Sequence, residues 1–176
     1  MTDSPVDQLA KAFDQAGRAL DAVDADNLDN PTPCSDWTVR QLAAHVASGP
    51  STWAQMTRGE QVDWSAIPDV PDGQWGPTFR AGADELLAAM RQLPEDQQGS
   101  VGFQVAEYAV HSWDLVRGTG ADLALDDSLA ETGLAAMQQG LTDDNRSGAF
   151  GSEVSAPADA SAYERLAAFA GRDPRG

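Results

Sequence analysis

The sequence predicts an all-α protein: a four-helix bundle with a long loop between the second and third helices and a short C-terminal extension. Three observations favour this fold. Apolar residues recur along most of the chain at the spacing of one helix face. Stretches that alternate apolar and polar residues with β-branched enrichment are scarce. The 176 residues, 41 % of them hydrophobic, suffice for one domain with a sizeable core and leave little room for a second.

The first helix is predicted at residues 6–23, where apolar side chains follow a spacing of three or four. This apolar face comprises Leu9, Ala12, Phe13, Ala16, Leu20 and Val23. Residues 27–36 are predicted to form a loop, because Pro31 and Pro33 break helical structure.

The second helix has a well-marked predicted start. Thr38 and Gln41 have the spacing of a capping box, in which each side chain accepts a hydrogen bond from the other's backbone N–H. Trp37 and Leu42 occupy the positions of a hydrophobic staple around this cap. Pro50, after a glycine, is expected to kink or interrupt the helix because it lacks the donor and clashes with the preceding turn.

The remaining elements are predicted from the same periodicity and from proline and glycine breakers. They are a Pro/Gly/Asp-rich connection at 59–77 that contains Trp64 and Trp75, helices at 78–93, 100–117 and 126–141, a short extended piece at 150–155, and a closing helix at 161–170. We therefore divide the chain into a bundle at residues 1–145 and a C-terminal extension at 146–176, which we expect to pack on the bundle.

Composition and charge exclude several classes of function. A formal net charge of −17 disfavours binding to nucleic acids and to anionic membranes. The chain has no run of ~18 apolar residues, and its start lacks the features of a signal peptide, so we expect a cytoplasmic protein. The single cysteine, Cys34, excludes an intrachain disulfide and a Cys-only zinc site. A small-molecule partner is expected, and a homodimer is left open.

The only two histidines, His45 and His111, both fall on predicted apolar helix faces. Glu107 lies four residues before His111, so the two side chains share one helix face, roughly 6 Å apart at Cβ. With His45 from a facing helix they would form a three-ligand metal site with an open position. However, such a Glu–His spacing also arises by chance, and a buried histidine is more often simply hydrogen-bonded. The spacing alone leaves both interpretations open.

Two motifs carry a family resemblance. Residues 32–45, TPCSDWTVRQLAAH, and residues 107–115, EYAVHSWDL, resemble the signatures of mycothiol-dependent maleylpyruvate isomerase-like proteins, which belong to the DinB-like superfamily of metal-binding four-helix bundles. The tail at residues 150–174 is similar to the ending of a stand-alone metal-binding subgroup. The resemblance implies that His45, Glu107 and His111 bind one divalent ion. The donor set suits zinc first, with nickel, iron or manganese as alternatives.

The departures from the family pattern limit what the resemblance implies. The isomerase carries a further C-terminal domain that contributes to its catalysis, whereas this chain has a short tail. The isomerase activity is therefore not carried over. Ser112 stands where the family usually has glycine, and Val116 where it usually has alanine. No catalytic residue beyond the metal centre is predicted.

Other residues near the predicted site have weaker assignments. Asp114, three residues after His111, either orients that ligand through a hydrogen bond or forms a salt bridge with Arg117 or Arg40. Trp53 continues the His45 face and is expected to line a substrate pocket. For Cys34, a buried small hydrophobe is favoured over a reactive thiol at a helix N-terminus, and we do not expect it to be a fourth ligand.

Three functions follow from an open His₂Glu site. The first is S-transfer or thiol-assisted isomerisation of a small electrophile, with mycothiol as co-substrate, because a metal can hold a thiol as thiolate. The second is metal-dependent hydrolysis, although Glu107 is assigned as a ligand and no separate general base is evident. The third is a non-enzymatic module that binds metal or another ligand.

Overall fold

The structure is a computed structural model that describes residues 3–34, 37–66, 68–146 and 148–175. These residues form helices and one isolated bridge between Pro31 and Thr38, which confirms the predicted all-α class. The elements are α1 (Pro5–Asp21), α2 (Val39–Thr57), α3 (Trp75–Gln92), the 3₁₀ helix η1 (Glu95–Gln97), α4 (Val101–Thr119), α5 (Asp127–Gly140) and α6 (Ala162–Phe169).

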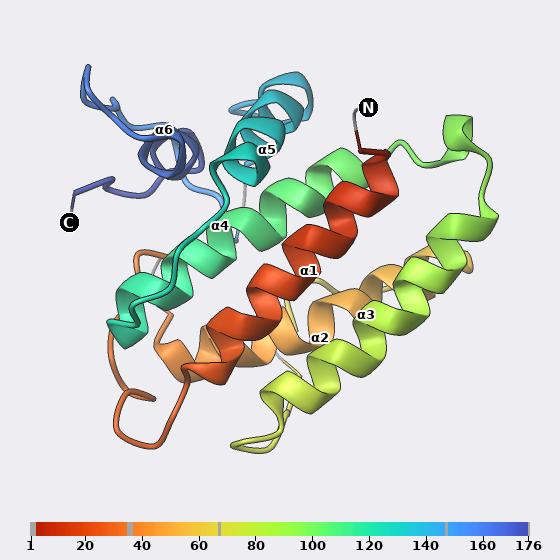
Figure 1. The fold of residues 1–176 in the computed structure, drawn as a ribbon, viewed down its shortest axis with the longest axis horizontal. Coiled ribbons are helices and arrows are strands. Elements are labelled where there is room, and N and C mark those ends of the chain that lie inside the picture. Colours follow the sequence, from red (N-terminus) through yellow and green to blue (C-terminus); the bar gives the residue numbers. More distant parts are fainter. Residues whose placement is uncertain (1–2, 35–36, 67, 147, 176) are drawn as a thin grey trace.

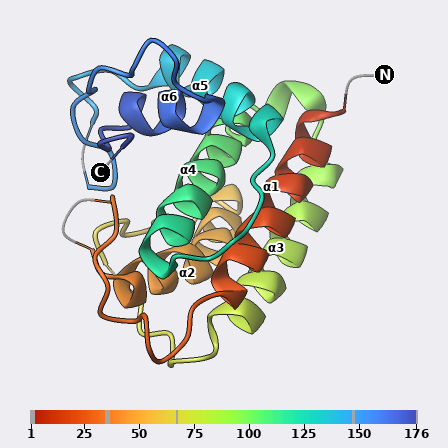
Figure 2. The ribbon, with the colours of Figure 1, turned by 60° about the vertical axis from the view of Figure 1, so that its left-hand side comes forward.

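Helices α1 to α4 form the bundle (Figure 1). Helix α2 packs chiefly on α3, and α1 lies against both α3 and α4. Helix α4 contacts α2 across the core, so residues of α4 can meet residues of α2 inside the bundle. Helices α5 and α6 lie together beside α4, away from α2 and α3 (Figure 2). None of the described helices is long and apolar enough to cross a membrane.

Both predicted starts of the first two helices are confirmed. Ser4 caps α1 by accepting a hydrogen bond from the backbone N–H of Asp7, and the proline that follows suits the first helical position. At α2, Thr38 Oγ1 accepts from the N–H of Gln41 at 3.4 Å, while Gln41 Oε1 accepts from the N–H of Thr38 at 3.0 Å. This capping box fixes where α2 begins, six residues before His45.

Of the two outcomes predicted for Pro50, a kink or an interruption, the interruption is wrong, because α2 continues through it to Thr57. The reason is tertiary packing: α3 presses on this turn at a glycine. A Cβ added at Gly82 would lie 2.6 Å from Ser51 Oγ and 3.3 Å from Pro50 Cβ. Close packing on both sides of the turn thus outweighs the missing hydrogen bond.

The predicted start of the third helix and the predicted end of the fourth also need correction. Helix α3 begins at Trp75, whose side chain is buried, and so this tryptophan does not lie in the connecting loop. The proline two residues later is tolerated there because amides of a first helical turn have no intrahelical partner. Helix α4 continues through Gly118 to Thr119 and ends at Gly120, which adopts the left-handed conformation (φ 70°). Gly118 instead provides close packing, since a Cβ there would lie 2.8 Å from Val39 Cγ2.

Residues 150–155, where a short extended piece is predicted, form neither a helix nor a strand. This segment instead runs beside α6, where the N–H of Val154 donates to the carbonyl of Ala168 at 3.0 Å. Gly171 (φ 91°) lies so close to this segment that an added Cβ would be 2.6 Å from the backbone of Gly151. The tail therefore turns back toward α4. The boundary at residues 145 and 146 stays a prediction.

Candidate metal centre

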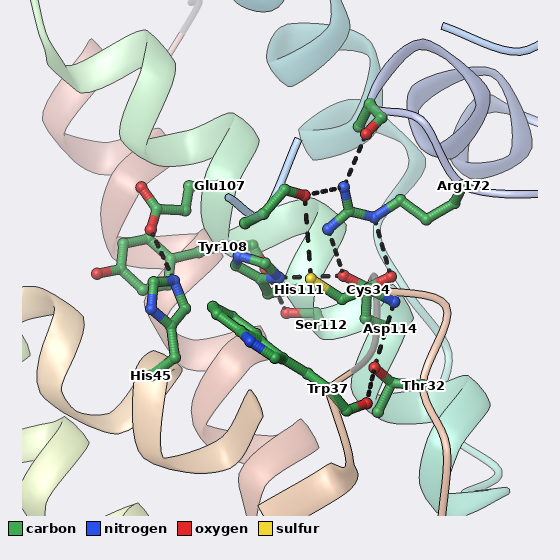
Figure 3. Close-up of polar contacts among 12 residues, drawn as sticks. Thr32, Cys34, Trp37, His45, Glu107, Tyr108, His111, Ser112, Asp114 and Arg172 are labelled. Atoms are coloured by element: carbon green, nitrogen blue, oxygen red, sulfur yellow. Dashed lines mark hydrogen bonds and ion pairs between the residues drawn. The ribbon is translucent and has the colours of Figure 1, made fainter. Parts of the chain in front are cut away.

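The structure brings together the three residues that the sequence predicts as ligands. His45 comes from α2, while Glu107 and His111 come from successive turns of α4, and Figure 3 shows His45 facing Glu107 across the gap between these helices. Their ligand atoms lie within 4.8 Å of one another. His45 Nε2 is 3.4 Å from Glu107 Oε1, and the two imidazole ring centroids are 5.1 Å apart. This spacing allows all three side chains to contact one ion.

The burial of these donors fits a metal ion. His111 is fully buried and Glu107 is 6 % exposed. Among the described residues, the buried Nε2 of His111 has no hydrogen-bond partner, and the buried Nε2 of His45 lies 3.4 Å from Glu107 Oε1. A buried polar atom without a partner is costly, and two imidazole nitrogens around one buried carboxylate form an unusual cluster. A divalent ion would satisfy all three donors at once.

The electrostatics of the two helix α4 residues also suit ligation. Burial disfavours the charged form of Glu107, but the hydrogen bond with His45 and the electrostatic interaction with the nearby imidazoles outweigh it and lower the pKa of the carboxyl. Burial lowers the pKa of His111, which keeps its imidazole neutral. A carboxylate and a neutral imidazole are the forms in which these side chains bind metals.

Asp114 lies behind His111 and contacts its other ring nitrogen. Asp114 Oδ2 is 3.0 Å from His111 Nδ1, so the carboxylate accepts a hydrogen bond from that nitrogen. The proton is thereby held on Nδ1, and the lone pair of Nε2 is directed toward Glu107 and His45. Both Asp114 and His111 are fully buried, which fixes the orientation of the ring.

The ion-pair partner of Asp114 is Arg172, a residue that the sequence analysis did not select. Its guanidinium donates from Nη2 to Asp114 Oδ2 at 2.9 Å and from Nε to Oδ1 at 3.2 Å. Arg172 is 2 % exposed and also donates to the carbonyls of Ala149 and Ala170. Of the partners predicted for Asp114, Arg40 pairs with Asp72. The guanidinium of the other, Arg117, lies over the ring of Trp113.

The ion pair between Asp114 and Arg172 offsets the cost of burying both charges. Burial would raise the pKa of Asp114, but the charge of Arg172 and the hydrogen bonds of His111 and Arg172 lower it, so the aspartate is ionised. The arginine was missed because it lies 58 residues further along the chain, in the tail. A signal for it existed: a carboxylate on an apolar helix face needs a cation, and Arg172 lies within the tail that carries the family resemblance.

Cys34 lies on the far side of His111 from Glu107. Its Sγ, together with His111 and Asp114, forms a second group of donor atoms within 4.8 Å of one another. However, Asp114 is already engaged by Arg172 and by His111 Nδ1. Burial raises the pKa of the Cys34 thiol to about 12. The trio of His45, Glu107 and His111 therefore suits a metal better than this group does.

A pocket of about 810 Å³ opens beside two of the three predicted ligands. Trp53 lines it together with His45 and Glu107, as expected from its position on the His45 face. Trp64 from the long connection lines it too, with its ring centroid 5.0 Å from that of Trp53. The pocket gives a small molecule access to the donor atoms.

A second pocket, of about 340 Å³, shares His45 and Trp64 with the first. Its walls differ in chemistry, because they contain five hydroxyl or amide side chains and one carboxylate, Asp63. The hydroxyl and amide side chains are those of Ser48, Ser51, Thr52, Gln55 and Gln61. Two pockets of different polarity therefore meet beside one candidate metal ligand.

Comparisons with known proteins bear on the same region. The family model described as the mycothiol maleylpyruvate isomerase N-terminal domain matches residues 9–116, a segment that contains His45, Glu107 and His111. Two uncharacterised proteins of Mycobacterium tuberculosis, from strains CDC 1551 / Oshkosh and ATCC 25618 / H37Rv, are each 31 % identical over 185 residues. Each match covers 94 % of this chain and 96 % of the relative, whereas no solved structure matches significantly. The chain thus belongs to the family of the mycothiol maleylpyruvate isomerase N-terminal domain.

Proposed function

We propose that this protein is a metal-dependent enzyme in which a small thiol, mycothiol, attacks a small electrophile. The buried His₂Glu cluster and the family membership support a metal and a thiol. The observation that carries the proposal is the meeting of two pockets of unlike chemistry at His45. Two pockets beside one centre suit a reaction between two molecules, and the polar one suits the hydrophilic body of the thiol.

The residues of the chain have distinct roles in this proposal. His45, Glu107 and His111 would hold one divalent ion, for which zinc is the first expectation and nickel, iron or manganese are alternatives. The ion would supply a positive charge that lowers the pKa of a thiol placed beside it. Asp114 and Arg172 fix the ring of His111 in the orientation that ligation needs.

Neither reaction needs a reactant other than the thiol and the electrophile. The thiol loses its proton to solvent, and its sulfur forms a bond to the electrophilic carbon. In S-transfer a leaving group departs with the bonding electron pair. In thiol-assisted isomerisation the adduct rotates about the carbon–carbon bond and then expels the sulfur. The aromatic walls of the larger pocket exclude water from the reacting carbon.

Hydrolysis by a metal-bound water is less well supported. It requires a general base within reach of the water. Among the described residues that line the larger pocket, only His45 and Glu107 have side chains that could act as a general base, and both are assigned as ligands. Asp114, further back, is engaged by Arg172. A non-enzymatic binding module would share the same metal centre, and turnover assays separate it from the proposed enzyme.

The first test is metal content. Protein purified without a metal-affinity tag is expected to carry about one divalent ion per chain by elemental analysis. His45→Ala, His111→Ala and Glu107→Gln should each lose most of it. Glu85→Gln is the matched control, because Glu85 is exposed and pairs only with Arg58 among the contacts described. Wild-type protein free of metal under metal-replete conditions would contradict the proposal.

The second test is thiol consumption. Zinc-loaded protein is incubated with mycothiol and a panel of small electrophiles, and loss of free thiol is followed against chelator-treated protein. We expect consumption that requires both metal and electrophile and is lost in His111→Ala. Product formation that proceeds equally without thiol would favour hydrolysis. Absence of turnover across the panel, with metal bound, would favour the binding module.

A further inference from the structure

We propose that the larger pocket selects an uncharged aromatic or apolar molecule and rejects carboxylates. The inference deepens the proposed function by assigning the class of electrophile, and rests on it for that assignment alone. The charge preference itself is a property of the pocket walls, and it can be measured without metal or thiol.

Aromatic side chains are prominent in the walls of the larger pocket. The aromatic lining residues are Trp37, Trp53, Trp64, Phe103 and Phe150. Four of them form two pairs: Trp53 lies 5.0 Å from Trp64, and Phe103 lies 5.7 Å from Phe150, between ring centroids. Ring faces and edges of this kind pack well against flat, uncharged molecules. The volume of about 810 Å³ accommodates a molecule of two fused rings with a substituent.

No lysine or arginine lines this pocket among the residues that the structure describes. The residues outside the described ranges include neither type. Two arginines of the C-terminal region have guanidinium groups that are engaged elsewhere: Arg146 follows the lining residue Asn145 in the chain, and Arg172 lies beside Phe150. Arg172, whose guanidinium carbon lies 5.6 Å from the centre of the Phe150 ring, donates to Asp114, and Arg146 donates to the carbonyls of Gly151 and Phe169.

An anionic ligand would therefore meet an unfavourable environment. It would leave water for apolar walls beside the Glu107 carboxylate, in a protein of formal net charge −17, without a basic side chain to pair with. Burying an unpaired charge is strongly disfavoured. A bound divalent ion would offset one carboxylate at the base of the pocket but not a second one further out.

The lack of a basic side chain among the described lining residues does not suit the substrate named in the family's description. Maleylpyruvate carries two carboxylates, and sites that bind dicarboxylates commonly use arginine, whose planar guanidinium matches a carboxylate with two hydrogen bonds. The buried guanidinium of Arg172, which lies beside Phe150, uses that geometry on Asp114. The walls thus favour an electrophile without carboxylates.

The test compares two fluorescent probes that share one ring system. N-phenyl-1-naphthylamine is neutral, and 8-anilino-1-naphthalenesulfonate carries one sulfonate. Both are titrated into the full-length protein in the presence of chelator. We expect the neutral probe to bind at least about tenfold more tightly. Trp64→Ala should weaken its binding, and this side chain is 40 % exposed, so the fold should tolerate the change. Phe103→Leu should weaken it as well, which locates the probe in the larger pocket because Phe103 lines that pocket and not the second one.

A second pair of variants tests the role of charge. Ser65→Arg adds a cation at an exposed lining position and should reduce the preference for the neutral probe several-fold. Gln97→Arg adds the same charge on η1, outside the lining, and should leave the preference unchanged. Equal affinities, tighter binding of the sulfonate, or no binding of the neutral probe would overturn the inference.

The outcome is independent of the proposed reaction. A neutral-probe preference in a protein that binds no metal would refute the proposed function and leave the pocket's selectivity standing. Metal binding together with equal affinity for the two probes would support the proposed metal centre and refute the charge preference of the pocket.

Discussion

At the scale of single residues, the most informative feature is the chain of contacts from Arg172 through Asp114 to His111. The predicted ligand trio depends on a helical spacing of four and on facing helices, and both are readable from sequence. Which nitrogen of His111 faces the centre is not readable, because it depends on a carboxylate and on a guanidinium from the tail. The sequence thus predicted the three candidate donors but not the Asp114–Arg172 contact behind one of them.

Asp114→Asn should therefore weaken metal binding. The amide can present its NH₂ to His111 Nδ1 and no longer enforces the Nδ1–H tautomer, so we expect affinity to fall by about tenfold to a hundredfold. Competition with a chromophoric chelator measures it. Because this change also leaves Arg172 buried without its partner, the double variant Asp114→Asn, Arg172→Met serves as a control with both charges removed. Wild-type affinity in both variants would show that Asp114 does not orient the ligand.

Cys34 should be chemically inert in the folded protein. Its thiol is fully buried and its pKa is raised to about 12, so at pH 8 only about one thiol in ten thousand would be ionised. We expect no reaction with a disulfide reagent in native buffer and complete reaction after denaturation in guanidinium chloride. Labelling of native protein at the rate of a small free thiol would contradict the burial of this side chain.

At the scale of elements, the helices were predicted well where caps and apolar faces agree, and less well where tertiary contacts decide. The capping box of α2 is local and was found. The continuation of α2 through Pro50 depends on α3 and was not. Glycines inside helices show the same limit, because a sequence does not reveal which helix lies against them. Gly133 of α5 is such a case, packed on Ala106 one residue before Glu107.

Gly133→Ala should destabilise the protein although alanine favours a helix by about 1 kcal/mol. The new Cβ would lie 2.8 Å from Ala106 Cα, a backbone atom that cannot move aside, so α5 must shift from α4. We expect a net loss of about 1–3 kcal/mol in the free energy of unfolding, measured with urea. Gly140→Ala in the same helix is the control, since a Cβ there meets nothing within 4 Å and should be neutral or slightly stabilising. Equal effects of the two changes would refute close α4–α5 packing.

At the scale of the whole molecule, the C-terminal region is joined to the bundle by buried polar contacts as well as by apolar packing. Gln15 of α1 donates to Tyr163 of α6 at 2.7 Å and accepts from the backbone of Asp126 at 2.8 Å. The bundle class was predictable from periodicity, but this joint was not, because its members lie far apart in sequence. The tail therefore has a structural connection to the candidate metal centre, through the residue that follows Gly171.

Gly171 is where this connection should be most sensitive. An alanine there would be strained at φ 91° and would place its Cβ 2.6 Å from the backbone of Gly151. We expect Gly171→Ala to reduce the free energy of unfolding by about 1–3 kcal/mol or more. Displacement of Arg172 from Asp114 should also lower metal affinity in the chelator competition.

The matched control for Gly171→Ala is Gly59→Ala. Gly59 has a similar positive φ of 79°, but a Cβ there meets nothing within 4 Å, and it lies after α2 far from the tail in sequence. The variant Gly59→Ala carries a similar backbone strain without the collision, so it should lose stability modestly and keep full metal affinity. If Gly171→Ala loses no more stability than Gly59→Ala and binds metal as wild type does, the tail does not support the centre. We expect Gly171→Ala to lose more stability and more metal affinity than Gly59→Ala, because the close contact between Gly171 and Gly151 positions Arg172 behind His111.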